Sequence, residues 1–248
     1  MSARFDNALD ELTATSASLG IDSFPATIFM WVKWNTIGTN NSHLLQYNNT
    51  GTHFLRCASR QTATGQAVAV QSATTFSGEP GDQTSGTWYP LLFRFDSALT
   101  YIENSVGSAS VTTAQTYQTN SGQNIAIGAG VGSAEDCWIS HVTLYNSDLT
   151  AQQQDDLLAG SDPSTVGSPV NYWSLVGATP SLTDSVGSVT LTNTSVTFAA
   201  DDPVLSGGVA DIIGDINVGF LVEAAFNPAA QGSGGGASKK NKQAYLIY

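Results

Sequence analysis

The sequence predicts an all-β fold, a β-sandwich of two antiparallel sheets with one short helix and an extended C-terminal arm. The chain contains 24 glycines, is rich in serine and threonine, and has only 11% charged residues, which is typical of short strands joined by frequent turns. About a dozen short segments have the alternating or continuous apolar pattern of strands. A single segment, 150–160, combines helical periodicity with helix start and stop signals.

The clearest strand is 27–34, with the sequence TIFMWVKW. Its residues alternate between two faces of a strand, Ile28, Met30, Val32 and Trp34 on one and Thr27, Phe29, Trp31 and Lys33 on the other. Residues 88–95 (WYPLLFRF) are the strongest apolar run, in which Pro90 predicts an edge strand or a bulge. Further strands are expected at 4–6, 44–47, 53–58, 66–71, 101–105, 125–128, 171–175, 184–187, 189–192 and 196–198.

Residues 137–160 combine a long strand with the helix. Apolar side chains of 137–145 fall on both parities, which predicts a strand covered on two sides or one that carries a bulge. After a turn, Thr150 is placed to cap the helix and Gln153 to complete a capping box. We expect Leu149, Leu157 and Leu158 to pack on a sheet, and Gly160 to end the helix.

Two of these segments resemble concanavalin A-like, laminin G-type jelly rolls. Residues 142–146 (VTLYN) followed by 147–150 (SDLT) are similar to the family's last strand and helix start, and 31–33 (WVK) to an earlier strand. The family usually has a glycine and acids where this chain has Cys137, Ser140 and His141. The resemblance implies a jelly-roll domain over residues 1–200, and any role that depends on those acids does not carry over.

Residues 201–248 depart from this pattern and predict an arm that binds another chain. Apolar side chains of 212–226 share one parity, as in a long strand with one apolar face, and 231–236 form a Gly-rich linker. An unpaired strand of this kind aggregates unless a sheet covers it. The predicted assembly interface consists of Ile212, Ile216, Val218, Phe220, Val222, Phe226, Lys239, Lys240, Lys242, Tyr245 and Tyr248.

The charge of the chain argues against nucleic acid as a partner. The net charge is −12, and three of the eight basic residues lie at 239–242, so five basic residues stand against twenty acidic ones in the rest of the chain. Such a surface repels DNA and RNA. The N-terminal residues show no signal peptide and no stretch is long enough for membrane insertion, from which we expect synthesis in a host cytoplasm.

The residues that could carry chemistry do not form a catalytic motif. Laminarinase-type endoglucanases of the same fold need a Glu-Xaa-Asp-Xaa-Xaa-Glu strand, which this chain lacks. The three histidines show no zinc-ligand spacing. Cys57 and Cys137 are expected to be buried thiols, although the sequence leaves a disulfide open. We therefore expect no enzyme and no cofactor other than a calcium ion.

Binding sites have two sets of candidates. Exposed aromatic rings with nearby carboxylates would bind a glycan, and the candidates form two groups, Trp88 and Tyr89 with Glu79 and Asp82, and Trp138 with Glu135 and Asp136. The alternative is that the tryptophans belong to the core. Loop acids that could bind calcium are Asp82, Glu135 and Asp136.

Two functional hypotheses follow from the sequence. In the first, the chain is a structural virion protein of a bacteriophage, such as a capsid decoration (cement) protein or a tail or fibre subunit, with a lectin-like head. Its partners would be copies of itself and other virion or capsid proteins. In the second, it is a free carbohydrate-binding module that binds surface glycans.

Overall fold

The computed structural model describes residues 2–7, 9–16, 19–21, 25–36, 42–47, 55–62, 65–71, 75–78, 83–95, 99–104, 108–112, 124–128, 136–177, 179–199 and 201–206. The chain divides into two units, Met1–Gly207 and Gly208–Tyr248, and every described residue belongs to the first. The predicted arm interface, 212–248, thus lies outside the described residues.

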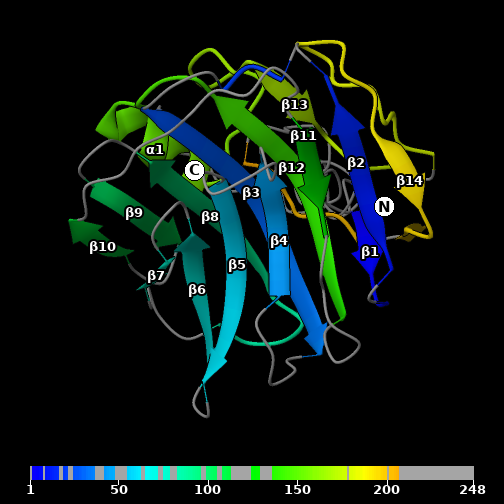
Figure 1. Cartoon of the computed structure of the whole chain (residues 1–248), viewed down its shortest axis with the longest axis horizontal. Helices are drawn as coiled ribbons and strands as arrows, with labels where there is room; N and C mark the ends of the chain where they lie inside the picture. Colours follow the sequence, from blue (N-terminus) through cyan, green and yellow to red (C-terminus); the bar gives the residue numbers. More distant parts are fainter. Residues whose placement is uncertain are drawn as a thin grey trace, which may run out of the picture. The chain divides into compact units, whose positions relative to one another are not determined.

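The predicted all-β sandwich is confirmed, because the described residues form two antiparallel sheets and one helix (Figure 1). Sheet A has the order β10-β9-β8-β3-β12-β1-β15, with β13 also paired to β12. Its strands are β1 (Ser2–Phe5), β3 (Ala26–Thr36), β8 (Trp88–Phe95), β9 (Leu99–Asn104), β10 (Ser108–Thr112), β12 (Asp136–Tyr145), β13 (Asn171–Trp173) and β15 (Thr197–Ala199).

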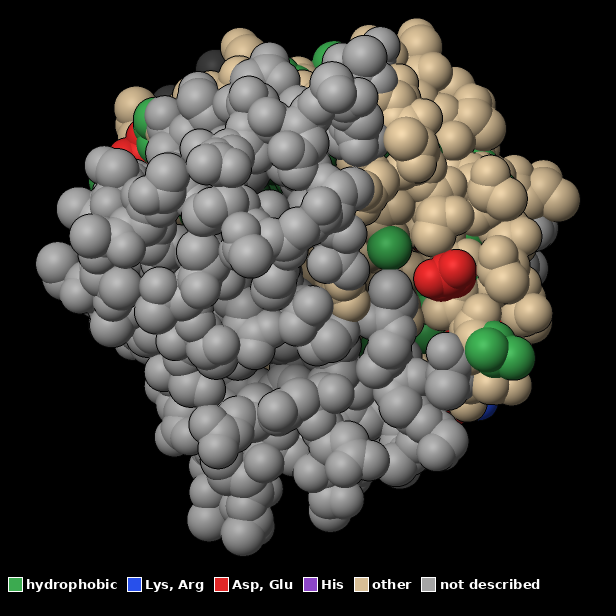
Figure 2. Space-filling model, viewed as in Figure 1, with side chains coloured by type: hydrophobic (Ala, Val, Ile, Leu, Met, Phe, Trp, Pro, Cys, Tyr) green, Lys and Arg blue, Asp and Glu red, His purple; other side chains and the backbone are tan. Residues whose placement is uncertain are grey.

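Sheet B has the order β14-β2-β11-β4-β5-β6-β7. Its strands are β2 (Glu11–Thr15), β4 (Ser42–Tyr47), β5 (Leu55–Thr62), β6 (Gly65–Gln71), β7 (Thr75–Gly78), β11 (Asn124–Ile127) and β14 (Thr192–Thr194). On the face shown in Figure 2 the described surface is mostly polar side chain and backbone, with few hydrophobic side chains.

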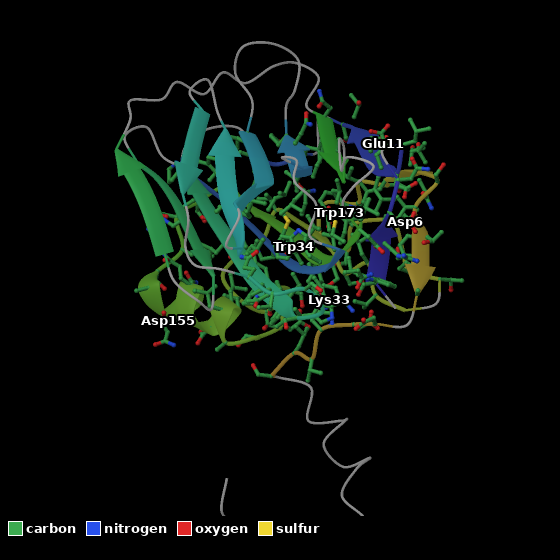
Figure 3. The ribbon with its side chains drawn as sticks, turned by 90° about the horizontal axis from the view of Figure 1, so that it is seen from below. Asp6, Glu11, Lys33, Trp34, Asp155 and Trp173 are labelled. Carbon is green, nitrogen blue, oxygen red and sulfur yellow. The ribbon has the colours of Figure 1, made fainter. Side chains whose placement is uncertain are left out.

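The main core lies between the sheets and follows the alternation of the strands. On β3, Ile28, Met30, Val32 and Trp34 point into this core, as predicted. Figure 3 shows Trp34 and Trp173 between the sheets. Cys57 of sheet B and Cys137 of sheet A are both buried in the same core as thiols, the position expected for them.

A second apolar cluster covers the outer face of sheet A. It joins Phe29 and Trp31 of β3 to Leu149 and Leu157 beside and within the helix α1 (Ala151–Leu158). The helix ends are those predicted, since Thr150 and Gln153 form the capping box and Gly160 has a φ of +96°. Because this layer covers one side of β12 and the main core covers the other, both parities of β12 can be apolar.

Two details of the strands refine the predictions. Strand β12 also carries the predicted bulge, a register shift against β3 between Ser140 and Thr143, where His141 has a φ of +50°. Strand β8 is internal to sheet A, so the expectation of an edge strand is wrong for the strand as a whole. Pro90 is tolerated because β9 pairs with β8 only from Leu91 onward.

Candidate functional site

The outer face of sheet A carries a row of alternating cations and tryptophans. The strand register places Arg4 of β1 opposite Trp138 of β12, Trp138 opposite Lys33 of β3, and Lys33 opposite Trp88 of β8. The Lys33 Nζ lies 5.2 Å from the ring centroid of Trp138 and 5.7 Å from that of Trp88, and the Arg4 guanidinium lies 5.7 Å from that of Trp138. These are cation–π distances, so the four strands are cross-linked by their side chains.

Lys33 is the buried centre of this row and has its carboxylate partner outside the sheet. Its side chain is only 7% exposed, and its Nζ forms an ion pair with Oδ2 of Asp201. The other oxygen of Asp201 accepts a hydrogen bond of 3.2 Å from Nε1 of Trp88. Burial lowers the pKa of Lys33, an effect that the charge of Asp136 opposes. We call Lys33, Trp88, Trp138 and Asp201 the Lys33 cluster.

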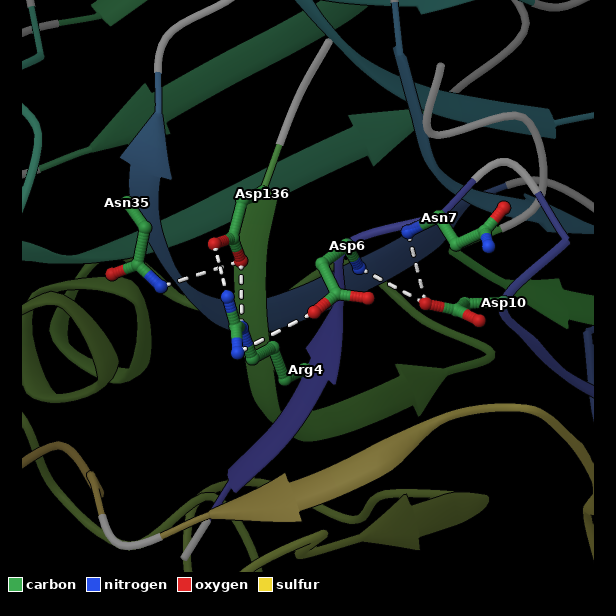
Figure 4. Close-up of polar contacts among 6 residues, drawn as sticks. All are labelled: Arg4, Asp6, Asn7, Asp10, Asn35 and Asp136. Carbon is green, nitrogen blue, oxygen red and sulfur yellow. Dashed lines mark hydrogen bonds and ion pairs between the residues drawn. The ribbon is translucent and has the colours of Figure 1, made fainter. Parts of the chain in front are cut away.

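A second network fixes the Arg4 end of the row (Figure 4). The Arg4 Nε and Nη2 donate to the two oxygens of Asp136 at 3.0 and 2.6 Å, and Asn35 Nδ2 donates to the same carboxylate at 3.3 Å. This hydrogen bond to Asp136 is the main cause that raises the pKa of Arg4. Both Asp136 oxygens are therefore engaged by protein donors, and the proposed calcium role of Asp136 stays a prediction.

Residues 201–206, which we call the strap, run along the outer face of sheet A next to Lys33 (Figure 3). Beside the contacts of Asp201, Ser2 Oγ donates to Asp202 at 2.8 Å, and the Ser206 N–H donates to the Gly160 carbonyl at 2.8 Å. Leu205 packs against the outer apolar cluster under α1, whereas Val204 is 86% exposed. The strap thus follows directly on the jelly roll and is held at both of its ends.

Three buried polar atoms next to the cluster have no hydrogen-bond partner among the described residues. They are Trp31 Nε1, Trp138 Nε1 and Ser140 Oγ. Ser140 lies opposite Trp31 in the register, one alternate position from the Trp138–Lys33 pair, so these atoms belong to adjacent positions of one sheet face. An unsatisfied buried donor costs about 1–3 kcal/mol, and three of the six such atoms of the described residues lie on this face, the others being Trp34 Nε1 in the main core and the two amide atoms of Gln83.

His141 belongs to the same face because the bulge in β12 turns it outward. Its Nδ1 lies 2.7 Å from the hydroxyl of Tyr172, whose ring stacks on the imidazole, and the side chain is buried. Burial lowers the pKa of His141 to about 4, against the opposing charges of Asp162 and Asp202. Burial, together with the charge of Asp162 and a hydrogen bond to it, raises the pKa of Tyr172. The pair is neutral at pH 7.

The His141 environment predicts a loss of stability in mild acid. Since the folded-state pKa lies below the unfolded value, the unfolded chain binds the proton first, and the free energy of unfolding falls as the pH drops from about 6.5 to about 4. The expected loss is about 3 kcal/mol over this window. Urea unfolding of the wild type and of His141→Gln at pH 7 and pH 4.5 measures it. The variant should lose less stability than the wild type, and equal losses would contradict the assignment.

The structure separates some of the predicted site residues and joins others. Trp88 and Tyr89 point to opposite faces of β8. Tyr89 lies in the main core, whereas Trp88 lies next to Lys33 on the outer face of sheet A. Trp88 and Trp138, placed in separate groups by the sequence, meet on either side of Lys33. Glu79, Asp82 and Glu135 lie outside the described residues, so the proposed glycan and calcium roles of these acids remain predictions.

Sequence reasoning missed Lys33, Arg4 and Asp201. The alternation of β3 does place Lys33 on the face opposite the core, but only the pairing of β3 with β8 and β12 brings it between two tryptophans. Among the described residues, no three His, Cys, Asp or Glu side chains are grouped as metal ligands. The helix in this part of the chain is too short and too polar to span a membrane.

Comparison with known proteins supports the fold. No family model and no curated protein matches the chain. Among solved structures, the native heptameric SAP-like pentraxin from Limulus polyphemus is similar to it, with a TM-score of 0.56 at 10% identity over 80% of this chain and 96% of the pentraxin chain. At this identity the similarity shows the fold alone, a lectin-like jelly roll.

Two weaker likenesses concern binding domains. The binding domain of botulinum neurotoxin serotype G has a TM-score of 0.47 at 11% identity, over 62% of this chain and 41% of that chain. Domain 4 of AbnA, a GH43 extracellular arabinanase from Geobacillus stearothermophilus in complex with arabinotriose, has a TM-score of 0.47 at 17% identity. The match covers 63% of this chain and 76% of that chain. Scores below 0.5 add nothing to the fold assignment.

Proposed function

We propose that this chain is a non-catalytic structural subunit of a larger assembly, with the jelly roll as a lectin-like head and residues 207–248 as the arm that binds neighbouring subunits. The observation that carries the proposal is the strap. Asp201, Asp202 and Ser206 are held to sheet A and to the end of α1 by side-chain and backbone bonds. These polar contacts place the start of the arm on the surface of the head, from which the arm can reach a neighbouring subunit.

The assembly that fits this design best is a bacteriophage virion, in which the chain would be a capsid decoration protein or a tail or fibre subunit. The polar acidic head is suited to face solvent at high copy number. The strand predicted at 212–226 is suited to pair with a neighbouring sheet, which would cover its apolar face. The lysines at 239–242 can contact the acidic head of a neighbouring copy. The heptameric pentraxin is an example of this fold in a homo-oligomer.

Truncation tests this function. We expect the full chain to form an oligomer, and a chain ending at Ser206 to be a monomer with the same midpoint of urea unfolding, as measured by light scattering and by circular dichroism. In the full chain, Phe220→Asp should also abolish the oligomer, whereas Asp215→Asn, on the opposite parity of the predicted strand, should not. A monomeric full chain, or an oligomer that survives the truncation, would refute the assembly role.

A second function, carbohydrate binding, is supported by the Lys33 cluster. The partly exposed ring of Trp88 beside the Lys33 cation, with unsatisfied donors on the same sheet face, combines a stacking surface and polar groups of the kind that bind sugars. Glycan-array binding by the full chain tests it, and the two functions are compatible in a head that binds surface glycans.

A further inference from the structure

We propose that the Lys33 cluster is a binding site for an acidic saccharide and that the strap is its built-in competitor, with Asp201 in the place of the sugar carboxylate. The inference deepens the carbohydrate-binding function proposed above and assigns it a ligand class and a regulatory element.

The first step is the way in which the cluster holds a carboxylate. Lys33 Nζ binds Oδ2 of Asp201 and Trp88 Nε1 binds Oδ1, so a cation and a neutral donor from adjacent strands each take one oxygen. Both donors belong to sheet A, whereas the carboxylate comes from a segment laid across it. The Asp201 side chain is 40% exposed while Lys33 is 7% exposed, so the carboxylate is the outermost group and can be exchanged for one from solution.

The second step is that Asp201 leaves donors unused. Trp31 Nε1, Trp138 Nε1 and Ser140 Oγ are buried without a partner among the described residues, on the same face as Lys33. Buried donors are almost always bonded in native structures, and an acceptor-rich molecule on this face would satisfy three of the six exceptions among the described residues. A saccharide supplies hydroxyl acceptors, and its ring can stack on the partly exposed indole of Trp88 beside Lys33, whereas Trp138 is only 7% exposed.

The third step is the choice of an acidic sugar among anions. Among the described residues, Lys33 is the cation that the site offers, because Arg4 is engaged by Asp136 in two hydrogen bonds. One lysine with indole N–H groups matches a single carboxylate set among hydroxyls, as in a uronic acid. A nucleic acid or another dense polyanion would meet the acidic groups Asp136, Asp201 and Asp202 around the site and would be repelled.

The strap can leave this face without unfolding the sandwich. Its described anchors are the Asp201 contacts, the Asp202–Ser2 and Ser206–Gly160 hydrogen bonds, the buried Pro203 and the packing of Leu205, and Val204 is 86% exposed. Segments with so few buried apolar contacts open at a fraction of the global unfolding free energy. Because Asp201 is tethered to the head, it competes at a high effective concentration and weakens the apparent affinity for a free ligand.

The test is binding of methyl α-D-galactopyranosiduronate, a sugar with a single carboxylate, to the full chain, measured by isothermal titration calorimetry, with the neutral methyl α-D-galactopyranoside as the matched sugar. Asp201→Asn removes the competing charge and should tighten binding of the uronate by about tenfold or more. Asp155→Asn is the control, since it removes an exposed carboxylate from α1, outside the strap, and should leave the affinity within about twofold. Adding Lys33→Met to Asp201→Asn should abolish the gain.

A second variant acts on the strap without touching the cluster. Leu205→Ala weakens the apolar anchor and should also tighten binding, and it carries the test if Asp201→Asn does not fold. The inference is overturned if neither variant gains affinity over Asp155→Asn, or if the gain is equal for the neutral sugar. In the first case, glycan binding by the wild type would still support the broader carbohydrate function. Oligomer formation through 207–248 is measured separately and depends on neither result.

Discussion

Replacing Gly128 with alanine should lower the free energy of unfolding by about 2–5 kcal/mol, from the strain of a left-handed backbone and from overpacking of the core. Gly128 follows β11 with a φ of +78°, and its N–H donates to the Leu44 carbonyl at 2.9 Å. A Cβ at this position would overlap the ring of Phe5, whose Cγ would lie 2.9 Å away with two further ring carbons closer still. Phe5 is fully buried and has no room to withdraw. Urea unfolding followed by tryptophan fluorescence measures the change.

Gly86→Ala is the matched control. Gly86 has nearly the same φ, +79°, but a Cβ there would meet nothing within 4 Å. The control should cost only the backbone strain, about 1–2 kcal/mol. The difference between the two variants isolates the clash with Phe5, and equal losses would show that the ring can move aside. Gly128→Ala with Phe5→Leu should recover part of the loss.

Asp184→Ala is expected to have a similarly large effect, about 3–5 kcal/mol, because it leaves several buried donors without a partner. Asp184 is buried and its two oxygens accept four hydrogen bonds. The donors are Asn171 Nδ2 at 2.7 Å and the backbone N–H groups of Tyr172, Val186 and Gly187 at 2.7, 2.8 and 2.6 Å. One carboxylate therefore joins β13 to the turn that follows it.

Two comparisons separate this role from a simple loss of charge. Asp155→Ala removes an exposed carboxylate from α1 and should change stability by no more than about 0.5 kcal/mol. Asp184→Asn keeps one acceptor oxygen and should fall between the alanine variant and the wild type in the midpoint of urea unfolding. If Asp184→Ala unfolds at the same urea concentration as Asp155→Ala, the carboxylate is dispensable and water replaces it.

The fold was predictable where the sequence pattern is local. The alternation of 27–34 assigns each side chain to a face without knowledge of the neighbouring strands, and the structure confirms it. The capping box of Thr150 and Gln153 is a contact within one helical turn, and it too is confirmed. The similarity to the pentraxin agrees with the jelly roll inferred from short motifs.

The candidate site was not predictable, because it depends on which strands are neighbours. Lys33 meets Trp138 and Trp88 only through the order β8-β3-β12, which joins strands far apart in the chain. Residues 184–187, expected as a closing strand, form a turn around the Asp184 carboxylate. An alternating apolar pattern cannot show that a polar side chain accepts hydrogen bonds from nearby backbone N–H groups and so forms a turn instead of a strand.

The two buried cysteines allow local opening of the sandwich to be measured by thiol labelling. Cys57 in β5 and Cys137 in β12 face the same core from opposite sheets, and burial raises the pKa of the Cys57 thiol well above its ordinary value. A disulfide-exchange reagent reacts with thiolates that it can reach. The rate at which each thiol is labelled under native conditions therefore measures how often the structure around that cysteine opens. Two equal rates would mean that the sheets separate as one cooperative event, and unequal rates would reveal which sheet opens first.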